Sequence, residues 1–179
     1  MNILLRGMVL LGLGGLLGSQ VVLASELPQV GQSAPDFSVE DQNGHMQRLE
    51  DYHGKWLVLY FYPKDETPGC TAEACAYRDD IQKLHALGAG VVGVSIDDAS
   101  SHAEFAEHHH LPFPLLADKD GTVSRHYGSE RNLLGVKIAR RNTFIIDPEG
   151  RIAKVYESVD AASNPAQVIA DLTEMKGMH

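Results

Sequence analysis

The sequence predicts an α/β protein in which one sheet is covered by helices on both sides. Segments with strand-like and helix-like patterns alternate along the chain, as they do in folds of this class. Residues 55–62 form a nearly continuous apolar run, which is typical of a central strand buried on both faces. The pair Asn43 and Gly44 separates two short segments and is a strong hairpin signal.

Each predicted element follows from its local pattern. Strands are predicted where short apolar and β-branched runs lie between turn residues: 36–40, 46–49, 55–62, 91–96, 113–116, 142–146 and 151–156. Helices are predicted over 67–87, 101–109, 121–127 and 165–176. Pro148 occupies the second position of a turn that joins the last two strands. No element is assigned to residues 128–141.

Length, charge and cysteine content exclude several classes of protein. A chain of 179 residues is about the size of one domain. The net charge of −9 argues against nucleic acid as a partner, because a groove that follows phosphates needs a basic surface. Two cysteines are too few for a disulfide-stapled small fold or a four-thiolate zinc site. We therefore expect either that the two cysteines pair or that at least one of them is reactive.

Residues 1–24 have the pattern of a secretory signal peptide. Arg6 precedes a Gly-rich apolar run of about a dozen residues, and Val22 and Ala24 are the small residues expected before a cleavage site. We expect cleavage before Ser25, export to the bacterial periplasm, and a single domain over residues 25–179. An uncleaved membrane anchor is the alternative, although the run is short for a stable membrane span.

The reactive chemistry is predicted in the segment from Pro63 to Cys75. Thr67 and Pro68 suit the N-cap and the first position of a helix, so Cys70 lies in the first helical turn. There the helix dipole and unpaired backbone N–H groups favour a thiolate. The acidic pair 65–66 opposes this effect, so a cation from elsewhere in the fold is needed.

The sequence around Cys70 resembles the active-site signature of the peroxiredoxins. The match begins with the pattern Pro63-x-x-x-Thr67-x-x-Cys70, and the longer run to Cys75 is similar to the Q-type branch, also called bacterioferritin comigratory protein. Weaker similarity extends from about Pro28 to the last helix. The resemblance implies a thioredoxin-like fold with an N-terminal β-hairpin and a central mixed sheet flanked by helices.

The resemblance also implies a role for each matching residue. Cys70 corresponds to the peroxidatic cysteine that attacks a hydroperoxide, and Cys75 to the resolving cysteine that forms a redox-active disulfide with it. Thr67 corresponds to the hydroxyl that hydrogen-bonds the sulfur and the peroxide, and Pro63 to the residue that shields the pocket from water. Arg141 corresponds to the guanidinium that holds the thiolate. Arg140 is the neighbouring alternative, and only one of two successive strand residues can face the pocket.

The implied activity is a thiol-dependent peroxidase of antioxidant defence that reduces hydrogen peroxide and organic hydroperoxides. It needs no cofactor or metal. The expected partners are the hydroperoxide and a thioredoxin-like or glutaredoxin-like reductant; we expect a monomer with no stable membrane association after signal cleavage. Export is a departure from the branch, whose members are more usually intracellular.

Three alternatives remain at this point. The cysteines could form a purely structural disulfide, although closing so short a loop would cost helix. They could instead serve an exported thioredoxin-fold electron-transfer or copper-handling protein. A metal site at residues 108–110 is disfavoured, because consecutive histidines on a helix point in different directions.

Overall fold

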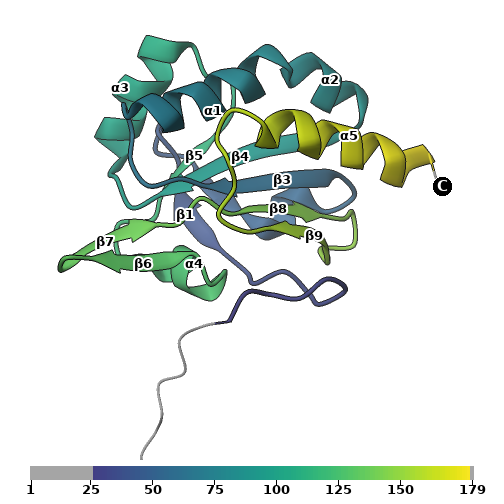
Figure 1. Ribbon diagram of the computed structural model, residues 1–179, viewed down its shortest axis with the longest axis horizontal. Coiled ribbons are helices and arrows are strands. Elements are labelled where there is room, and N and C mark those ends of the chain that lie inside the picture. Colours follow the sequence, from purple (N-terminus) through teal and green to yellow (C-terminus); the bar gives the residue numbers. More distant parts are fainter. Residues whose placement is uncertain (1–25, 178–179) are drawn as a thin grey trace, which may run out of the picture.

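A five-stranded mixed sheet forms the centre of the structure, a computed structural model that describes residues 26–177 (Figure 1). The strand order is β5 (Leu115–Ala117), β4 (Ala89–Ser95), β3 (Trp56–Phe61), β8 (Thr143–Ile146) and β9 (Ile152–Tyr156). Strands β3, β4 and β5 are parallel, whereas β8 is antiparallel to both β3 and β9. The predicted mixed sheet is therefore confirmed. The predicted leader, residues 1–24, lies outside the described residues.

Helices cover both faces of this sheet, as the sequence predicts. Four helices lie on one face: α1 (Pro68–Asp79), α2 (Ile81–Ala86), α3 (Ala99–His109) and α5 (Asn164–Gly177) (Figure 1). The opposite face packs against α4 (Thr122–His126) and the short 3₁₀ helix η1 (Leu49–Tyr52). No helix within residues 26–177 is long and apolar enough to cross a membrane.

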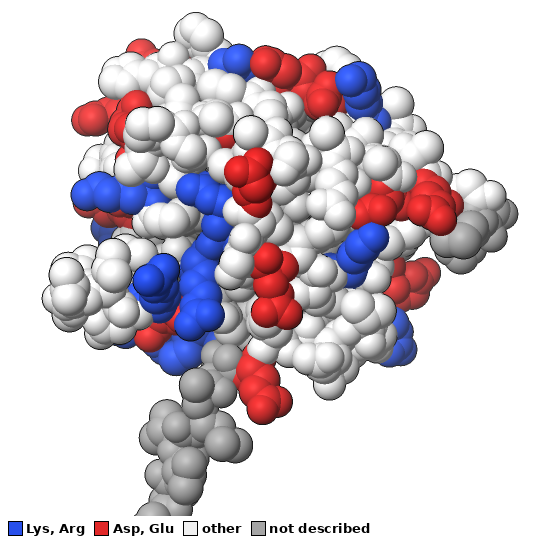
Figure 2. Space-filling model, in the orientation of Figure 1, with Lys and Arg blue, Asp and Glu red and all other residues white. Residues whose placement is uncertain are grey.

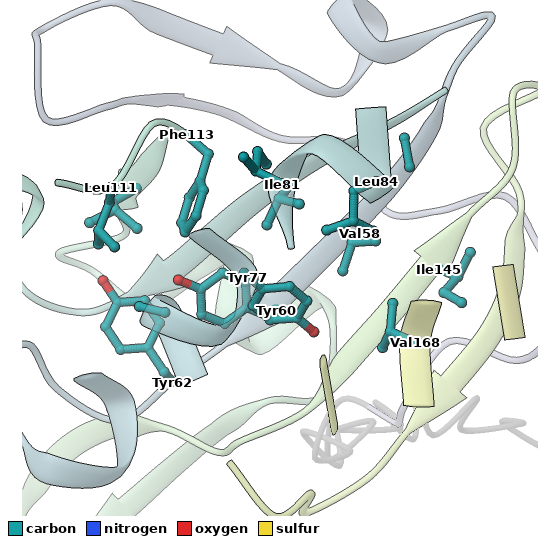
Figure 3. Packing of buried hydrophobic residues seen from close by; sticks show 14 of the residues in the cluster. Val58, Tyr60, Tyr62, Tyr77, Ile81, Leu84, Leu111, Phe113, Ile145 and Val168 are labelled. Carbon is teal, nitrogen blue, oxygen red and sulfur yellow. The ribbon is translucent and has the colours of Figure 1, made fainter. Parts of the chain in front are cut away.

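Strand β3 divides the core into two layers because its side chains alternate between the two faces of the sheet. Val58, Tyr60 and Tyr62 point into the layer beneath α1, and Figure 3 shows the rings of Tyr60, Tyr62 and Tyr77 gathered there. A Cβ at Gly93 would lie 2.8 Å from the Tyr60 ring, so glycine at this position allows the close approach. This aromatic layer supports the helix that carries Cys70.

Two features differ from the sequence prediction. The helix predicted over 67–87 is divided at Asp80, whose φ of −98° and ψ of 8° end α1 and begin α2. A second hairpin, formed by β6 (Glu130–Leu133) and β7 (Val136–Ala139), occupies the region to which no element was assigned. By contrast, the N-terminal hairpin of β1 (Ser38–Glu40) and β2 (Met46–Arg48) is confirmed.

Candidate active site

The sequence around Cys70 places its thiol at the beginning of α1. The chain leaves β3 at Phe61 and enters the helix through Thr67, an N-cap residue with extended backbone (φ −86°, ψ 144°). Pro68 is the first residue of the helix, and its fixed φ suits that position. The N–H groups of Gly69 and Cys70 have no acceptor within the helix, so they and the helix dipole favour negative charge on the sulfur.

Arg141 supplies the cation that the sequence argument requires. Its Nη2 donates to Cys70 Sγ at 3.3 Å, across 71 positions of sequence. Glycine at 69 allows this approach, because a Cβ there would lie 3.3 Å from Arg141 Nη2. Burial by itself would lower the pKa of Arg141, but Glu73 and the Cys70 thiol raise it overall. The arginine therefore stays charged beside the thiol, whereas Arg140 is exposed and makes no hydrogen bond to Cys70 in the described structure.

Glu73 holds Arg141 from the other side and was not anticipated. Its carboxylate is fully buried and pairs with the guanidinium through Oε2. Within residues 26–177, Oε1 has no hydrogen-bond partner. Burial therefore dominates and raises the pKa of Glu73 to about 7, although Arg141 acts in the opposite direction. The available sequence signal was an acidic residue three positions after Cys70, next to the core-facing stripe of the helix.

The other two predicted site residues, Thr67 and Pro63, belong to the segment that leads into α1. The Thr67 hydroxyl donates to the Lys64 carbonyl at 2.9 Å and makes no side-chain capping bond to the helix. Its oxygen lone pairs remain able to accept a hydrogen bond from a hydroperoxide. Pro63 lines a pocket of about 460 Å³ that Arg140 and Arg141 also line.

A buried network anchors the loop that precedes Cys70. The carboxylate of Asp65 accepts hydrogen bonds from Tyr62 at 2.8 Å and Ser101 at 2.7 Å, and it lies 2.8 Å from Nδ1 of His102. Nε2 of His102 lies 3.0 Å from the Leu116 carbonyl, so both ring nitrogens face acceptors. Burial by itself would raise the pKa of Asp65, but these hydrogen bonds lower it overall. A charged carboxylate thus fixes the loop to α3.

Glu66 is held by the end of the same helix. Its two oxygens lie 2.9 Å from His108 Nδ1 and 3.0 Å from His109 Nε2. The hydrogen bond to Glu66 raises the pKa of His108. Both acidic residues of the loop are thus hydrogen-bonded to histidines of α3, and the expectation that Asp65 and Glu66 oppose the thiolate stays a prediction. His108 and His109 are solvated loop anchors.

Cys75 lies on a more exposed side of α1 than Cys70 does. It is partly exposed, whereas Cys70 is only 1% exposed and belongs to the core layer with Tyr60 and Tyr77. Arg78, three residues further along the helix, pairs with Asp79 at 2.8 Å. Both cysteines are free thiols in this folded helix. Residues five apart in an α-helix have Cα atoms roughly 8–9 Å apart, too far for a disulfide.

The fold and this site define a class of protein, a thioredoxin-fold thiol peroxidase, and comparisons with known proteins agree. Residues 30–155 match the model of the AhpC/TSA family. The chain is 44% identical to a putative Bcp peroxiredoxin of Coxiella burnetii over 148 residues, which are 80% of this chain and 98% of the relative. It is 39% identical to peroxiredoxin Bcp of Bacillus subtilis over 156 residues, 82% and 96% of the two chains. The chain belongs to the AhpC/TSA family of peroxiredoxins, with the Bcp and peroxiredoxin Q proteins among its relatives.

Solved structures agree with this assignment. Peroxidoxin BcpB of Mycobacterium tuberculosis superposes with a TM-score of 0.78 at 35% identity, covering 82% of this chain and 97% of its own. The bacterioferritin comigratory protein of Xanthomonas campestris, described for its alkyl peroxide reduction activity, superposes with a TM-score of 0.76 at 32% identity and covers 82% and 99%. The thioredoxin-like fold is thus confirmed, and the copper-handling alternative finds no support among these relatives.

Proposed function

We propose that this peroxiredoxin uses Cys70 as the peroxidatic residue and Cys75 as the resolving residue. The observation that carries the proposal is the 3.3 Å hydrogen bond from Arg141 to the Cys70 sulfur at the start of α1. The guanidinium and the helix N-terminus stabilise the thiolate, which is the nucleophilic form of cysteine. Cys75, five positions further along the helix, is the only other cysteine of the chain and the one available to resolve the oxidised sulfur.

In the first step the Cys70 thiolate attacks one peroxide oxygen of ROOH and the O–O bond breaks. Cys70 becomes a sulfenic acid, and the leaving oxygen takes up a proton and departs as an alcohol, or as water when the substrate is hydrogen peroxide. Arg141 and the N–H groups at the helix start are placed to stabilise the negative charge that develops on oxygen. Cys75 then attacks the sulfenic sulfur, which releases water and leaves a disulfide.

The proposed cycle ends with reduction by an external dithiol protein. Two electrons return from a thioredoxin-like or glutaredoxin-like reductant through thiol–disulfide exchange, which restores both thiols. Hydrogen peroxide and organic hydroperoxides are the proposed substrates, and alkyl peroxide reduction by the X. campestris relative supports the latter. We place this activity outside the cytoplasm, on the basis of the leader-like pattern in residues 1–24, and propose that the enzyme acts as a monomer.

Substitution of each cysteine separates the two proposed roles. Cys70→Ser should abolish peroxide reduction, because no thiolate remains at the helix start. Cys75→Ser should consume about one equivalent of peroxide and accumulate a sulfenic acid that a dimedone-type probe labels. The measurement is peroxide consumption by the reduced protein, with thiols counted before and after.

The opposite pattern contradicts the assignment of roles. If Cys70→Ser retains turnover and the probe labels Cys75, the two roles are exchanged. If Cys75→Ser alone retains full turnover with the natural reductant, resolution does not use the Cys70–Cys75 disulfide. Ser100→Ala is a matched control, since Ser100 is exposed on α3 and its hydroxyl donates to Asp98, away from the loop that precedes Cys70.

A further inference from the structure

The β6–β7 hairpin exposes an apolar tip. Of the five large apolar side chains that are exposed within residues 26–177, three lie at this tip: Leu133 at 45%, Leu134 at 98% and Val136 at 63% exposure. The hairpin projects from the edge of the molecule (Figure 1). A contiguous exposed apolar group on a projecting element marks an interaction site more often than isolated exposed residues do.

The turn itself departs from the residues that its backbone favours. Leu133 pairs with Val136, so Leu134 and Gly135 form a two-residue turn, and both have positive φ (52° and 88°). Such a turn favours Asn-Gly or Asp-Gly, because leucine is strained at positive φ. Among the described residues, four non-glycine residues have positive φ, and Leu134 is the only apolar one. A leucine that is both strained and fully exposed indicates a function outside the fold.

Basic residues continue this apolar surface toward the pocket that Pro63 and Arg141 line. Cross-strand partners share a face of a hairpin, so Arg131 and Ile138 lie on the same face as Leu133 and Val136. Arg131, Ile138 and Arg140 also line the pocket that contains Arg141. Within residues 26–177, neither Arg131 nor Arg140 pairs with a carboxylate. Figure 2 shows Lys and Arg side chains gathered beside the hairpin, although the chain carries a net charge of −9.

The opposite face of the hairpin is already occupied. Glu130 pairs there with Arg125 at 2.8 Å and with Lys137 at 3.5 Å. These pairs hold the hairpin against the α4 region and leave the face of Leu133, Val136 and Arg131 without a partner in the described structure. This free face, together with Leu134 and Arg140, is named the hairpin surface below.

We propose that the hairpin surface docks reversibly onto an anionic lipid bilayer. The aliphatic tip would enter the interfacial region, and Arg131 and Arg140 would lie beside the lipid phosphates, whose negative charge attracts such residues. The rest of this acidic chain would be repelled by the same surface, so binding is oriented. The pocket that Pro63 and Arg141 line would then open toward the lipid.

Other occupants fit the hairpin surface less well. A second copy of the chain, packed by a two-fold axis, would bring the arginines of both copies together. A protein partner would need a wide interface, with about 800 Å² buried per side, and such interfaces are centred on aromatic anchors. The hairpin offers a narrow projecting tip with Leu and Val only.

Leu134→Asn tests the proposal without loss of the fold. Asparagine removes the apolar side chain and suits a positive φ, so the hairpin should be at least as stable as in the wild type. The readouts are co-sedimentation with vesicles of phosphatidylcholine, alone or mixed with phosphatidylglycerol, and amide exchange over residues 131–138. Wild type and variant share the same N-terminus, so any binding by that end of the chain is common to the two, and the exchange readout reports the hairpin alone. Val30→Asn, at a residue 64% exposed elsewhere, is the matched control.

We expect the wild type to bind the phosphatidylglycerol vesicles in a salt-sensitive manner, with protection of the hairpin amides. Leu134→Asn should bind at least about tenfold more weakly, because full burial of a leucine is worth about that factor or more, whereas Val30→Asn should bind like the wild type. Equal binding by Leu134→Asn, equal binding to phosphatidylcholine alone, or hairpin amides that vesicles do not protect would overturn the proposal. A concentration-dependent dimer that Leu134→Asn abolishes would overturn it in favour of a second copy.

The activity consequence rests on the proposed function of Cys70. Leu134→Asn should lower kcat/KM for a phospholipid hydroperoxide carried in anionic vesicles by about the factor lost in binding. Its kcat/KM for hydrogen peroxide should be unchanged, because Leu134 is at the hairpin tip and does not line the pocket of Pro63 and Arg141. Vesicle binding does not require Cys70, so Cys70→Ser should bind like the wild type. Failure of the docking proposal is thereby distinguishable from failure of the catalytic one.

Discussion

Arg141 and Arg140 are adjacent in sequence but differ in what their side chains reach. Arg141 donates to Cys70, whereas Arg140 is exposed at the pocket rim. We expect Arg141→Ala to reduce the thiolate population of Cys70 at neutral pH and to slow peroxide attack by about a hundredfold, since loss of one charge-stabilising donor commonly costs that much. Arg140→Ala should change the rate only slightly. The measurements are thiolate absorbance against pH and stopped-flow peroxide reduction; equal effects of the two substitutions would refute the assignment.

Glu73 should make stability depend on pH near neutrality. Its pKa of about 7 in the folded protein lies above the value of 4.5 expected when the chain is unfolded. Between these values the folded protein holds a proton that the unfolded chain releases, so this group lowers the free energy of unfolding as the pH rises through the window. Glu73→Gln keeps an acceptor for Arg141 and removes the titration. Relative to wild type, the free energy of unfolding of the variant should increase by up to about 3 kcal/mol as the pH rises from 5 to 8.

Urea unfolding of both proteins at several pH values measures this difference. The expected result is a difference in the free energy of unfolding between variant and wild type that increases from acid to neutral pH. Glu104→Gln, at a carboxylate on the surface of α3, is the control and should show no such trend. A gap for Glu73→Gln that is constant with pH would show that Glu73 stays ionised when buried.

At the scale of single residues, the local sequence predicted those features of the site that depend on a residue's position in its own helix. The Thr67-Pro68 start of α1 and the position of Cys70 in its first turn follow from helix rules, and both are confirmed. The hydrogen bonds of Asp65 and Glu66 to α3 were not predictable, because their histidine partners lie 37 to 43 positions away. The same holds for Glu73, since burial of a carboxylate becomes understandable only when its arginine partner is known.

The α1 helix must change its conformation if Cys70 and Cys75 form a disulfide. Their Cα atoms are roughly 8–9 Å apart in a regular helix, and a disulfide tolerates no more than about 7 Å. We expect the disulfide form to lose helix content by circular dichroism. Amide exchange should become faster mainly over residues 66–80, because local opening is confined to one cooperative segment.

The reduced protein and Cys75→Ser treated with the same peroxide are the controls for this experiment. Both lack the disulfide, so both should keep the full helix signal. A disulfide form with the helicity and amide protection of the reduced form would contradict the proposed conformational cycle.

At the scale of elements, patterning predicted most of the sheet but missed the β6–β7 hairpin. Strands β3, β4 and β8 are buried and read as apolar runs, so they were recognisable. The hairpin was not, because its turn contains Leu134 in place of Asn or Asp and its strands are largely exposed. The break at Asp80 was missed because α1 and α2 share one apolar stripe, which Tyr77, Ile81 and Leu84 continue across it.

For the whole molecule, the compartment is a prediction from the sequence of residues 1–24. We expect the protein to be recovered from the periplasmic fraction with Ser25 as its first residue, because the segment has the charge, apolar run and small residues of a secretory leader. Mass spectrometry of the purified protein measures this. Ala24→Phe should block cleavage, since a small residue is needed there, while Ser25→Ala should be processed normally. An intact N-terminus in the cytosolic or membrane fraction would contradict cleavage.

The overall architecture was predictable because the alternation of strands and helices leaves few arrangements. The alternating burial of β3 in two core layers confirms the sheet with helices on both faces. The relative placement of distant segments was beyond sequence patterning, and it was the resemblance to peroxiredoxins that paired Arg141 with Cys70. Long-range contacts of this kind depend on tertiary packing, which local propensity does not encode.

The position of Cys70 in the core layer has a consequence for the reduction potential of the enzyme. Cys70 and Ala74 are each only 1% exposed, and unwinding the first turns of α1 would expose both. Losing this burial destabilises the disulfide form by roughly 2 kcal/mol, at about 0.8 kcal/mol per buried methylene-sized group. For a two-electron couple this raises the potential by about 40 mV. The packing of one small helix face would thereby make the oxidised enzyme easier to reduce.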